Sequence, residues 1–313
     1  HMNPDGDAAG SVMGLAHYIH GVYPQYRVMP YLAETLDKGP KKLVMSDQVF
    51  HPFVKPEEQR WGVIVCDTAT VARIIGRELY ENAVFSMVID HHASDEGYGD
   101  LNWTQVSEAC AENIYYMLDW NRWRAAAAKS QSQEALYPNA ADYIYLGIVH
   151  DTGSFARAEA STFQAAIDLR DMGAAHREIM KTMHAETFSD MMRRAELFRL
   201  VRREIDDKVA YVTVNQEQIR EMGISYEDIH PVGSLLRDCE DIELGFTMYE
   251  EEPGVWRCSF RSDGKWVDVN ELMAPFGGGG HVGAAGLRKR TDNVEELRNQ
   301  ILERIRLMRA GKA

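Results

Sequence analysis

The chain has 313 residues, of which 45% are hydrophobic and 26% charged, and this balance is typical of a globular protein with one or two domains. Its formal net charge of -14 argues against a protein that grips long nucleic acid, because that binding needs an extended basic surface. No apolar run approaches the about 20 residues that cross a bilayer, and the opening residues do not resemble a signal peptide. We therefore expect no membrane partner, a cytoplasmic location and reduced cysteines.

The first half of the chain predicts a parallel sheet. Residues 61–67 and 83–90 are apolar and β-branched, and each run ends in an aspartate, as buried strands of such sheets often do. Residues 70–80 have helical spacing, so the three segments together predict a βαβ unit whose ligands bind at the carboxyl ends of the strands. Residues 108–128 also predict helix, whereas 142–149 fits either a strand or a buried helix.

The character of the sequence changes near residues 183–205, which are charged and helical in pattern. Three strand-like runs, a glycine cluster and an amphipathic helix follow, at 209–214, 243–249, 256–261, 277–280 and 294–308. The predicted fold is α/β: a domain with a mainly parallel sheet flanked by helices at 1–187, a helical linker at 188–206, and a smaller α+β domain at 207–313. The active site is expected in the cleft between the two domains.

The opening residues combine metal-ligand side chains with a turn. His1, Asp5 and Asp7 lie in the run His-Met-Asn-Pro-Asp-Gly-Asp, and a helical pattern follows from Ser11. One imidazole and two carboxylates on a turn suit a divalent cation. An Asx turn that caps the following helix explains the same residues equally well.

Three further pieces carry the same ligand types. Asp67 ends the first predicted strand, Asp90, His91 and His92 end the next, and Asp151 precedes a glycine turn. Taken singly, each is more often a helix cap or a solvated side chain than a ligand. Their weight comes from their order along the chain.

In that order the motifs resemble the DHH phosphoesterase superfamily, which takes its name from the Asp-His-His found here at 90–92. The block 277–281, preceded by Arg261, Ser262 and Asn270, resembles the substrate-binding domain of one branch of this superfamily. Its layout is similar to the oligoribonucleases and 3′-phosphoadenosine-5′-phosphate phosphatases called nanoRNases. Four ordered motifs with the glycine block are far more specific than any one of them.

The resemblance implies a role for each matching residue. His1 and Asp5 would hold one divalent metal ion, Asp7, His91 and Asp151 the other, and Asp67 would bridge the two, while His92 would face the phosphate beside Asp90. Two such ions can deprotonate a shared water and neutralise the leaving group, and the donor set favours Mn²⁺, with Mg²⁺ or Co²⁺ as alternatives. The substrate would be bound by Arg261, Ser262, Asn270, Gly278, Gly279, Gly280 and His281.

The substrate-binding role has an alternative. Arg261 can pair with a phosphate in a fork, and glycines let backbone N–H groups approach an anion closely. The same glycines can instead serve as a hinge that uses only their conformational freedom. We favour the phosphate clamp because Arg261 and His281 flank the glycines.

Two features depart from the resemblance. The first motif of the family follows a strand and none precedes His1, so we expect that the natural chain continues upstream. Relatives carry small hydroxyl residues after the third motif, where this chain has Ser-Glu-Ala-Cys-Ala-Glu at 107–112. The histidines outside the motifs, His150 and His230 among them, are expected to be structural or surface residues.

The expected activity is hydrolysis of short oligoribonucleotides, from di- to pentanucleotides, to nucleoside monophosphates, together with 3′-phosphoadenosine-5′-phosphate. A RecJ-like exonuclease is disfavoured because it needs a basic track with stacking aromatics, and the glycine block argues against an inorganic pyrophosphatase. A linear or cyclic dinucleotide phosphodiesterase and a catalytically silent nucleotide sensor stay open. A homodimer is also compatible with the sequence.

Overall fold

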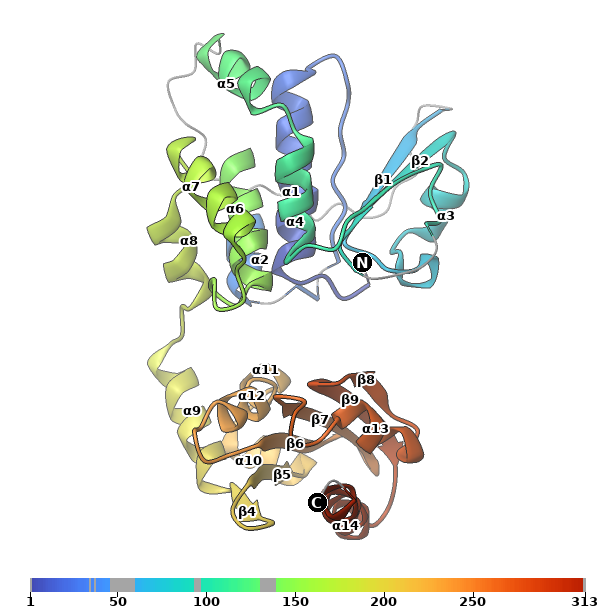
Figure 1. The fold of residues 1–313 in the computed structure, drawn as a ribbon, viewed down its shortest axis with the longest axis vertical. Helices are drawn as coiled ribbons and strands as arrows, with labels where there is room; N and C mark the ends of the chain where they lie inside the picture. Colours follow the sequence, from blue (N-terminus) through green and yellow to red (C-terminus); the bar gives the residue numbers. More distant parts are fainter. Residues whose placement is uncertain are drawn as a thin grey trace. The chain divides into compact units, whose positions relative to one another are not determined.

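The computed structural model describes residues 2–33, 35–36, 38–45, 60–92, 97–129 and 139–311. The chain forms two compact units, His1–Ala185 and Glu186–Ala313 (Figure 1). Each unit has a hydrophobic core of its own, and the predicted α/β class is confirmed. Within the described ranges, no helix is long and apolar enough to span a membrane.

A three-stranded parallel sheet with the order β1-β2-β3 lies in the N-terminal unit. β1 (Gly62–Cys66) and β2 (Phe85–Asp90) confirm the two predicted strands, and β3 (Leu101–Thr104) is an additional one. β1 and β2 pair in parallel up to Cys66 opposite Ile89. The side chains that follow the two strands are therefore delivered to the same edge of the sheet.

The connection between β1 and β2 differs from the predicted helix over 70–80. It consists of a 3-10 turn, η1 (Val71–Arg73), and a short helix, α3 (Arg77–Glu81). The break lies at Gly76, whose left-handed φ of 62° is incompatible with a continuous helix. Regular apolar spacing predicted the segment's helical character but not this interruption.

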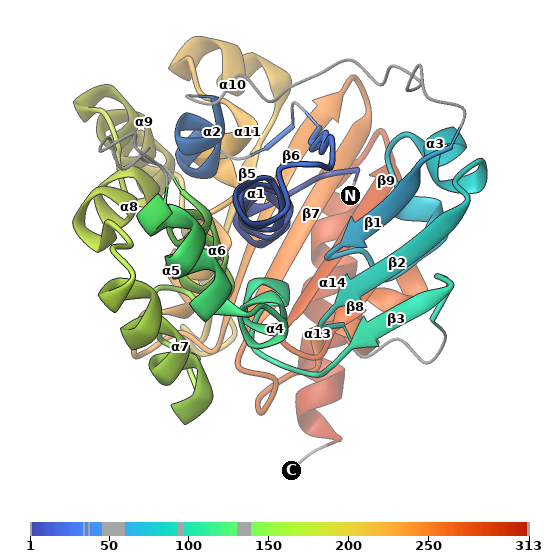
Figure 2. The ribbon, with the colours of Figure 1, turned by 90° about the horizontal axis from the view of Figure 1, so that it is seen from above.

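Two helices, α1 (Gly6–Val22) and α6 (Ala140–Asp151), cross at the centre of this unit. A Cβ atom at Gly10 would lie 2.4 Å from the carbonyl oxygen of Tyr143, so the approach requires glycine. Nearly every residue of α6 is buried, which shows that the ambiguous segment 142–149 is a buried helix. Figure 2 shows α1 end-on between the sheet and α6, α7 and α8.

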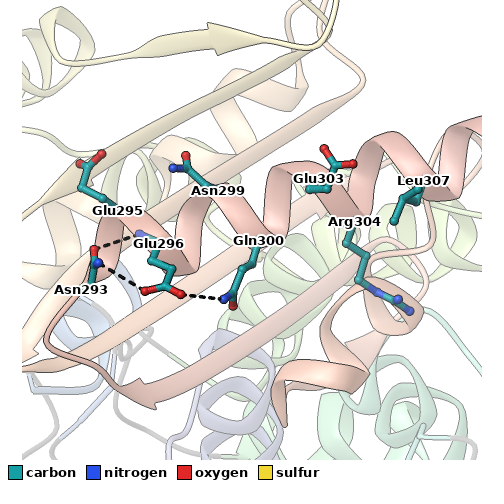
Figure 3. Close-up of a pocket in the computed structure, with 8 residues that line it drawn as sticks. All are labelled: Asn293, Glu295, Glu296, Asn299, Gln300, Glu303, Arg304 and Leu307. Atoms are coloured by element: carbon teal, nitrogen blue, oxygen red, sulfur yellow. Dashed lines mark hydrogen bonds between the residues drawn. The ribbon is translucent and has the colours of Figure 1, made fainter.

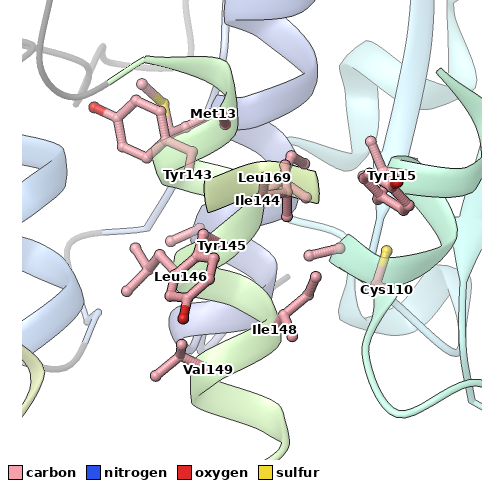
Figure 4. Close-up of a cluster of buried hydrophobic side chains, with 14 of the residues drawn as sticks. Met13, Cys110, Tyr115, Tyr143, Ile144, Tyr145, Leu146, Ile148, Val149 and Leu169 are labelled. Atoms are coloured by element: carbon pink, nitrogen blue, oxygen red, sulfur yellow. The ribbon is translucent and has the colours of Figure 1, made fainter. Parts of the chain in front are cut away.

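Further helices pack around this pair. Tyr143, Ile144 and Ile148 of α6 form a buried cluster with Cys110 and Leu169 (Figure 4). The predicted helix over 108–128 is two helices, because Leu118 adopts extended backbone and ends the first of them. The surrounding helices are α2 (Lys38–Met45), α4 (Cys110–Met117), α5 (Trp120–Lys129), α7 (Ala160–Asp171) and α8 (His176–Met183).

The C-terminal unit is built on a mixed sheet with the order β4-β5-β6-β7-β9-β8, in which β5 and β6 pair in parallel and the other neighbours are antiparallel. The strands are β4 (Arg202–Glu204), β5 (Val209–Val214), β6 (Leu244–Glu252), β7 (Val255–Ser262), β8 (Gly279–His281) and β9 (Ala284–Arg290). The helices are α9 (Phe188–Arg199), α10 (Gln216–Met222), α11 (Tyr226–Ile229), α12 (Val232–Arg237), α13 (Val269–Met273), the 3-10 turn η2 (Ala274–Phe276) and α14 (Val294–Ala310). All three predicted strands and the predicted final helix are present.

The side chains of strand β7 alternate between the two faces of this sheet. Trp256, Cys258 and Phe260 are buried in one cluster with Leu297 and Ile301 of α14. Because side chains alternate along a strand, the residues between them point to the opposite face, which α11 and α12 cover in part. Charged residues of β7 can therefore line a surface there.

Candidate active site

Two strand ends place Asp67 and Asp90 together. Asp67 follows β1 directly, and its N–H donates to the Ile89 carbonyl oxygen over 2.9 Å. Its φ of 52° lies in the left-handed region, which aspartate tolerates better than most residues but which still marks a constrained position. Asp90 is the last residue of β2, so the two aspartates end the strands as the sequence predicted, and both carboxylates are buried.

The N-terminus of α1 holds the next two carboxylates. Oδ1 of Asp5 caps the helix, accepting from the N–H groups of Asp7 and Ala8 at 2.9 and 3.0 Å. Asp7 is buried and accepts from the N–H groups of Cys110 and Ala111, at 2.6 and 2.9 Å. The N-terminus of α4 therefore fixes the Asp7 side chain. The opening run of the sequence thus both caps α1, through Asp5, and supplies a buried carboxylate, Asp7.

His91 is oriented by a backbone carbonyl. Its Nδ1 lies 3.1 Å from the carbonyl oxygen of Ser107, which makes Nδ1 the donor. Its Nε2 lies 3.4 Å from Asp151 Oδ2, 3.5 Å from Asp67 Oδ1 and 3.9 Å from Asp7 Oδ2. A histidine whose Nδ1–H is bound to a carbonyl and whose Nε2 faces carboxylates has the arrangement of a metal ligand.

Asp151 lies at the C-terminal end of α6, where the helix dipole disfavours a negative charge. The turn that follows is tight, with left-handed φ at Gly153, Ser154 and Phe155. Potential ligand atoms within 4.8 Å of one another form three groups: Asp7, His91 and Asp151; Asp5, His150 and Asp151; Asp67, Asp90, His91 and His92. The structure thus brings together every described residue that the resemblance assigned to metal binding, while His1 lies outside the described residues.

The cluster has an excess of negative charge. Burial, followed by the charges of Asp67 and Asp151, raises the pKa of Asp7 well above its ordinary value, and burial also raises that of Asp5. Burial alone would lower the pKa of His91, but its hydrogen bond to Asp67 and the charge of Asp7 raise it to about 10. The raised pKa values show that this group of carboxylates and imidazoles favours added positive charge. Such a group is suited to binding divalent cations.

Asp90 holds His92 beside this cluster. Its Oδ1 lies 2.7 Å from His92 Nδ1 and accepts the N–H of His91 at 2.8 Å, and the bond to Asp90 raises the pKa of His92. Asp90 is 1% exposed, and its Oδ2 has no hydrogen-bond partner among the described residues. Asp90 is thus placed to orient His92, whose side chain remains partly exposed.

His150, expected to be a structural or surface residue, lies in one of these groups with Asp5 and Asp151. His150 packs against Gly6, where a Cβ atom would lie 2.5 Å from its ring, and its Nδ1 lies 3.6 Å from Asp151 Oδ1. That nitrogen is buried and makes no hydrogen bond with the described residues. The only signal in the sequence was its place next to Asp151, which does not distinguish the two faces of a helix end.

The predicted substrate-binding residues lie in the C-terminal unit. Arg261 and Gly279 line one hollow of about 390 Å³. Arg261 donates to the hydroxyl of Ser259 at 3.0 Å and to a backbone carbonyl at 2.9 Å, so its bonds in this structure go to neutral oxygens. Asn270 accepts the N–H of Gly280 at 2.9 Å and so connects α13 to the glycine block.

Other members of this set have structural partners. Ser262 is buried, and its hydroxyl donates to the Val267 carbonyl while accepting the N–H of Gly264. A Cβ atom at Gly278 would lie 2.5 Å from a carbonyl oxygen of β9, so close packing of β8 on β9 requires glycine there. His281 is exposed on β8. Direct substrate contacts by these residues stay predictions.

A second hollow, of about 670 Å³, runs along α14 and is lined by none of these residues (Figure 3). Three of its lining side chains are glutamates, and Gln300 donates to Glu296 at 3.4 Å. One helix alone lines it, from Asn293 to Leu307. Its three glutamates make it a poor site for a phosphorylated substrate.

Two family models match this chain: "DHH family, N-terminal domain" over residues 1–148 and "DHHA1 domain" over residues 206–307. The chain belongs to the DHH family of phosphoesterases. The two matched regions together make up well over half of the sequence, and they fall in the two units of the structure. The resemblance drawn from the ordered motifs is confirmed.

Three similar proteins match this chain over most of its length. The probable bifunctional oligoribonuclease and PAP phosphatase NrnA of Streptococcus mutans is 27% identical, over 96% of this chain and 92% of that protein. The bifunctional oligoribonuclease and PAP phosphatase NrnA of Bacillus subtilis is also 27% identical, over 91% of this chain and 86% of that protein. An exopolyphosphatase-related protein from Bacteroides fragilis shares the fold, with a TM-score of 0.80 at 18% identity over 98% of this chain and 91% of that one.

Proposed function

We propose that this chain uses two divalent metal ions to hydrolyse short oligoribonucleotides, from di- to pentanucleotides, to nucleoside monophosphates, and that it also dephosphorylates 3′-phosphoadenosine-5′-phosphate. The convergence of His91 and Asp151 on the buried carboxylate of Asp7, in a cluster with excess negative charge, carries this proposal. The names of the Streptococcus mutans and Bacillus subtilis relatives, which match over most of both chains, support the substrate class.

The proposal assigns the metal ligands to two sets. Asp5 and His1 would hold one ion, with His150 adding an imidazole, and Asp7, His91 and Asp151 would hold the other, with Asp67 shared. When bound, the ions supply Lewis acidity and lower the pKa of a bound water. The mixture of carboxylates and imidazoles favours Mn²⁺, with Mg²⁺ and Co²⁺ as alternatives.

The chain's own residues position the reacting groups. Ser107 and Asp90 fix the rings of His91 and His92 through their Nδ1 atoms. Asp90 thereby leaves Nε2 of His92 to hold a proton toward a phosphoryl oxygen. Arg261, with Asn270, Ser262 and the block 278–281, would bind the rest of the substrate in the C-terminal unit.

A panel of substrates tests the proposal. The full chain with Mn²⁺ is compared by initial rate on mononucleotides, 3′-phosphoadenosine-5′-phosphate, linear and cyclic dinucleotides, and long single strands. We expect the linear di- and trinucleotides to be cut fastest. Cleavage of long strands with intact dinucleotides would contradict the proposal, and tight binding without turnover in Mn²⁺, Mg²⁺ and Co²⁺ would identify a silent sensor. A cytoplasmic location and a homodimer stay predictions.

A further inference from the structure

The proposed shared ligand, Asp67, lies in a turn whose backbone conformation is unfavourable by itself. Its φ of 52° falls in the left-handed region, which a residue other than glycine keeps only where its surroundings impose it. The direction of the carboxylate depends on this conformation, because the backbone sets where the Cβ atom points. Oδ1 of Asp67 lies 3.5 Å from His91 Nε2 and 3.7 Å from His92 Nδ1, so a relaxed turn would move it away from both rings.

Three hydrogen bonds between described residues hold this turn. The N–H of Asp67 donates to the Ile89 carbonyl oxygen at 2.9 Å, which ties the turn to β2. The Thr68 hydroxyl donates to the Cys66 carbonyl oxygen at 3.1 Å and so spans Asp67 locally. The Tyr98 hydroxyl donates to the Thr68 carbonyl oxygen at 2.5 Å. Of these three bonds, the one from Tyr98 is made by a side chain that comes from a distant part of the sequence.

The surroundings of Tyr98 fix its ring. The Tyr80 hydroxyl donates to the carbonyl oxygen of Tyr98, and the two rings meet edge to face with their centres 5.9 Å apart. Tyr98 also packs against the buried cluster that contains Val65 and Val88. At the next residue, Gly99, a Cβ atom would lie 2.9 Å from Val88 Cγ2, so this segment runs close against β2. The Tyr98 hydroxyl therefore acts on the turn from a fixed position.

We propose that Tyr98 is a positioning residue, whose hydroxyl holds Asp67 in its left-handed turn and thereby aims the shared carboxylate at the metal ions. The inference rests on the proposed function and adds to it a residue outside the ordered motifs. Tyr98 acts through the Thr68 carbonyl group, and not as a ligand or a catalytic residue. Loss of the hydroxyl would free the turn to relax, so metal affinity should fall although the ring remains packed.

Tyr98→Phe tests this role because it removes the hydroxyl and keeps the ring. We expect the variant to bind Mn²⁺ about tenfold more weakly in a titration followed by electron paramagnetic resonance, since groups that orient metal ligands contribute to affinity on this scale. Tyr18→Phe is the matched control, because the Tyr18 hydroxyl donates to the Asp119 carbonyl oxygen at 2.9 Å in the same unit. The control should lower the midpoint of thermal unfolding as Tyr98→Phe does, but it should bind Mn²⁺ as the wild type does.

A double-mutant cycle separates positioning from a general loosening of the fold. In an Asp67→Asn background the shared carboxylate is gone, so Tyr98→Phe should change the Mn²⁺ affinity by less than about twofold. Wild-type affinity in Tyr98→Phe, equal weakening by Tyr18→Phe, or the same weakening in both backgrounds overturns the proposal. The titration needs no turnover. If the substrate panel shows no hydrolysis while the coupling to Asp67 holds, the proposed function fails and the positioning role stands.

Discussion

Buried carboxylates in the two units have opposite surroundings. In the N-terminal unit, Asp7 accepts hydrogen bonds from the backbone of α4 and lies near Asp67 and Asp151, and burial with these charges raises its pKa. In the C-terminal unit, Asp228 bonds to the Arg193 guanidinium at 3.1 Å, and although burial opposes it, this bond lowers the pKa of Asp228. Asp228 is therefore paired with a positive side chain of the protein itself. Asp7 instead lies in a cluster that favours a bound cation.

The comparison distinguishes a structural carboxylate from a functional one. A buried charge that is paired within the protein contributes to folding, whereas like charges gathered without a paired arginine or lysine cost stability unless a ligand compensates them. The cluster of Asp5, Asp7, Asp67 and Asp151 is of the second kind, because its described partners are backbone donors, a hydroxyl and histidines. Substitutions at the two kinds of carboxylate should therefore have separable effects.

The largest effect is expected for Asp67→Asn. Loss of the shared carboxylate should reduce kcat by about a thousandfold or more, because metal ions contribute several kcal/mol to the transition state. Bound Mn²⁺, measured by elemental analysis after gel filtration, should fall below that of the wild type. Asp171→Asn, an exposed carboxylate in the same unit, is the control. Full activity of Asp67→Asn would remove the shared-ligand assignment.

Asp90→Asn tests orientation without loss of metal. Asp90 contacts His92 Nδ1 at 2.7 Å and belongs to the proposed orienting groups, so we expect kcat to fall by about 10- to 100-fold. The Mn²⁺ content and KM should stay close to those of the wild type. A variant that loses its metal would instead show that Asp90 is itself a ligand.

The sequence predicted the ends of the two N-terminal strands better than it predicted the connections between the elements. Strand ends at Asp67 and Asp90 follow from apolar runs that end in aspartate, since alternation and length suffice to identify buried strands. The break at Gly76 and the end of α4 at Leu118 depend on local backbone conformations that apolar spacing does not report. The position of His150 beside Asp5 and Asp151 was not predicted, because it depends on how α6 crosses α1, a tertiary packing that no local pattern contains.

Asp228→Asn tests the paired carboxylate of the C-terminal unit. The folded-state pKa of Asp228 is lowered, so its contribution to stability is complete above the unfolded-state pKa and is lost as the pH falls through the folded-state value. We expect the variant to reduce the free energy of unfolding by about 2 kcal/mol at neutral pH, with a smaller difference from the wild type in acid. Denaturant unfolding at several pH values measures this. Mn²⁺ binding should not change, and a loss of metal would contradict the separation of the two kinds of carboxylate.

The smallest effect is expected for His150→Gln. This variant tests whether His150 binds the metal itself or only lies beside the metal ligands. If the imidazole with its buried Nδ1 adds to the Asp5 and Asp151 set, the variant should bind Mn²⁺ about tenfold more weakly and recover most of its activity at saturating metal. Titration of free Mn²⁺ by electron paramagnetic resonance measures the affinity independently of turnover. His20→Gln, an exposed histidine on α1, controls for the loss of an imidazole from the same unit. Equal Mn²⁺ affinities in the wild type and in His150→Gln would show that the metal ligands are complete without His150. His150 would then have the structural role that the sequence first assigned to it.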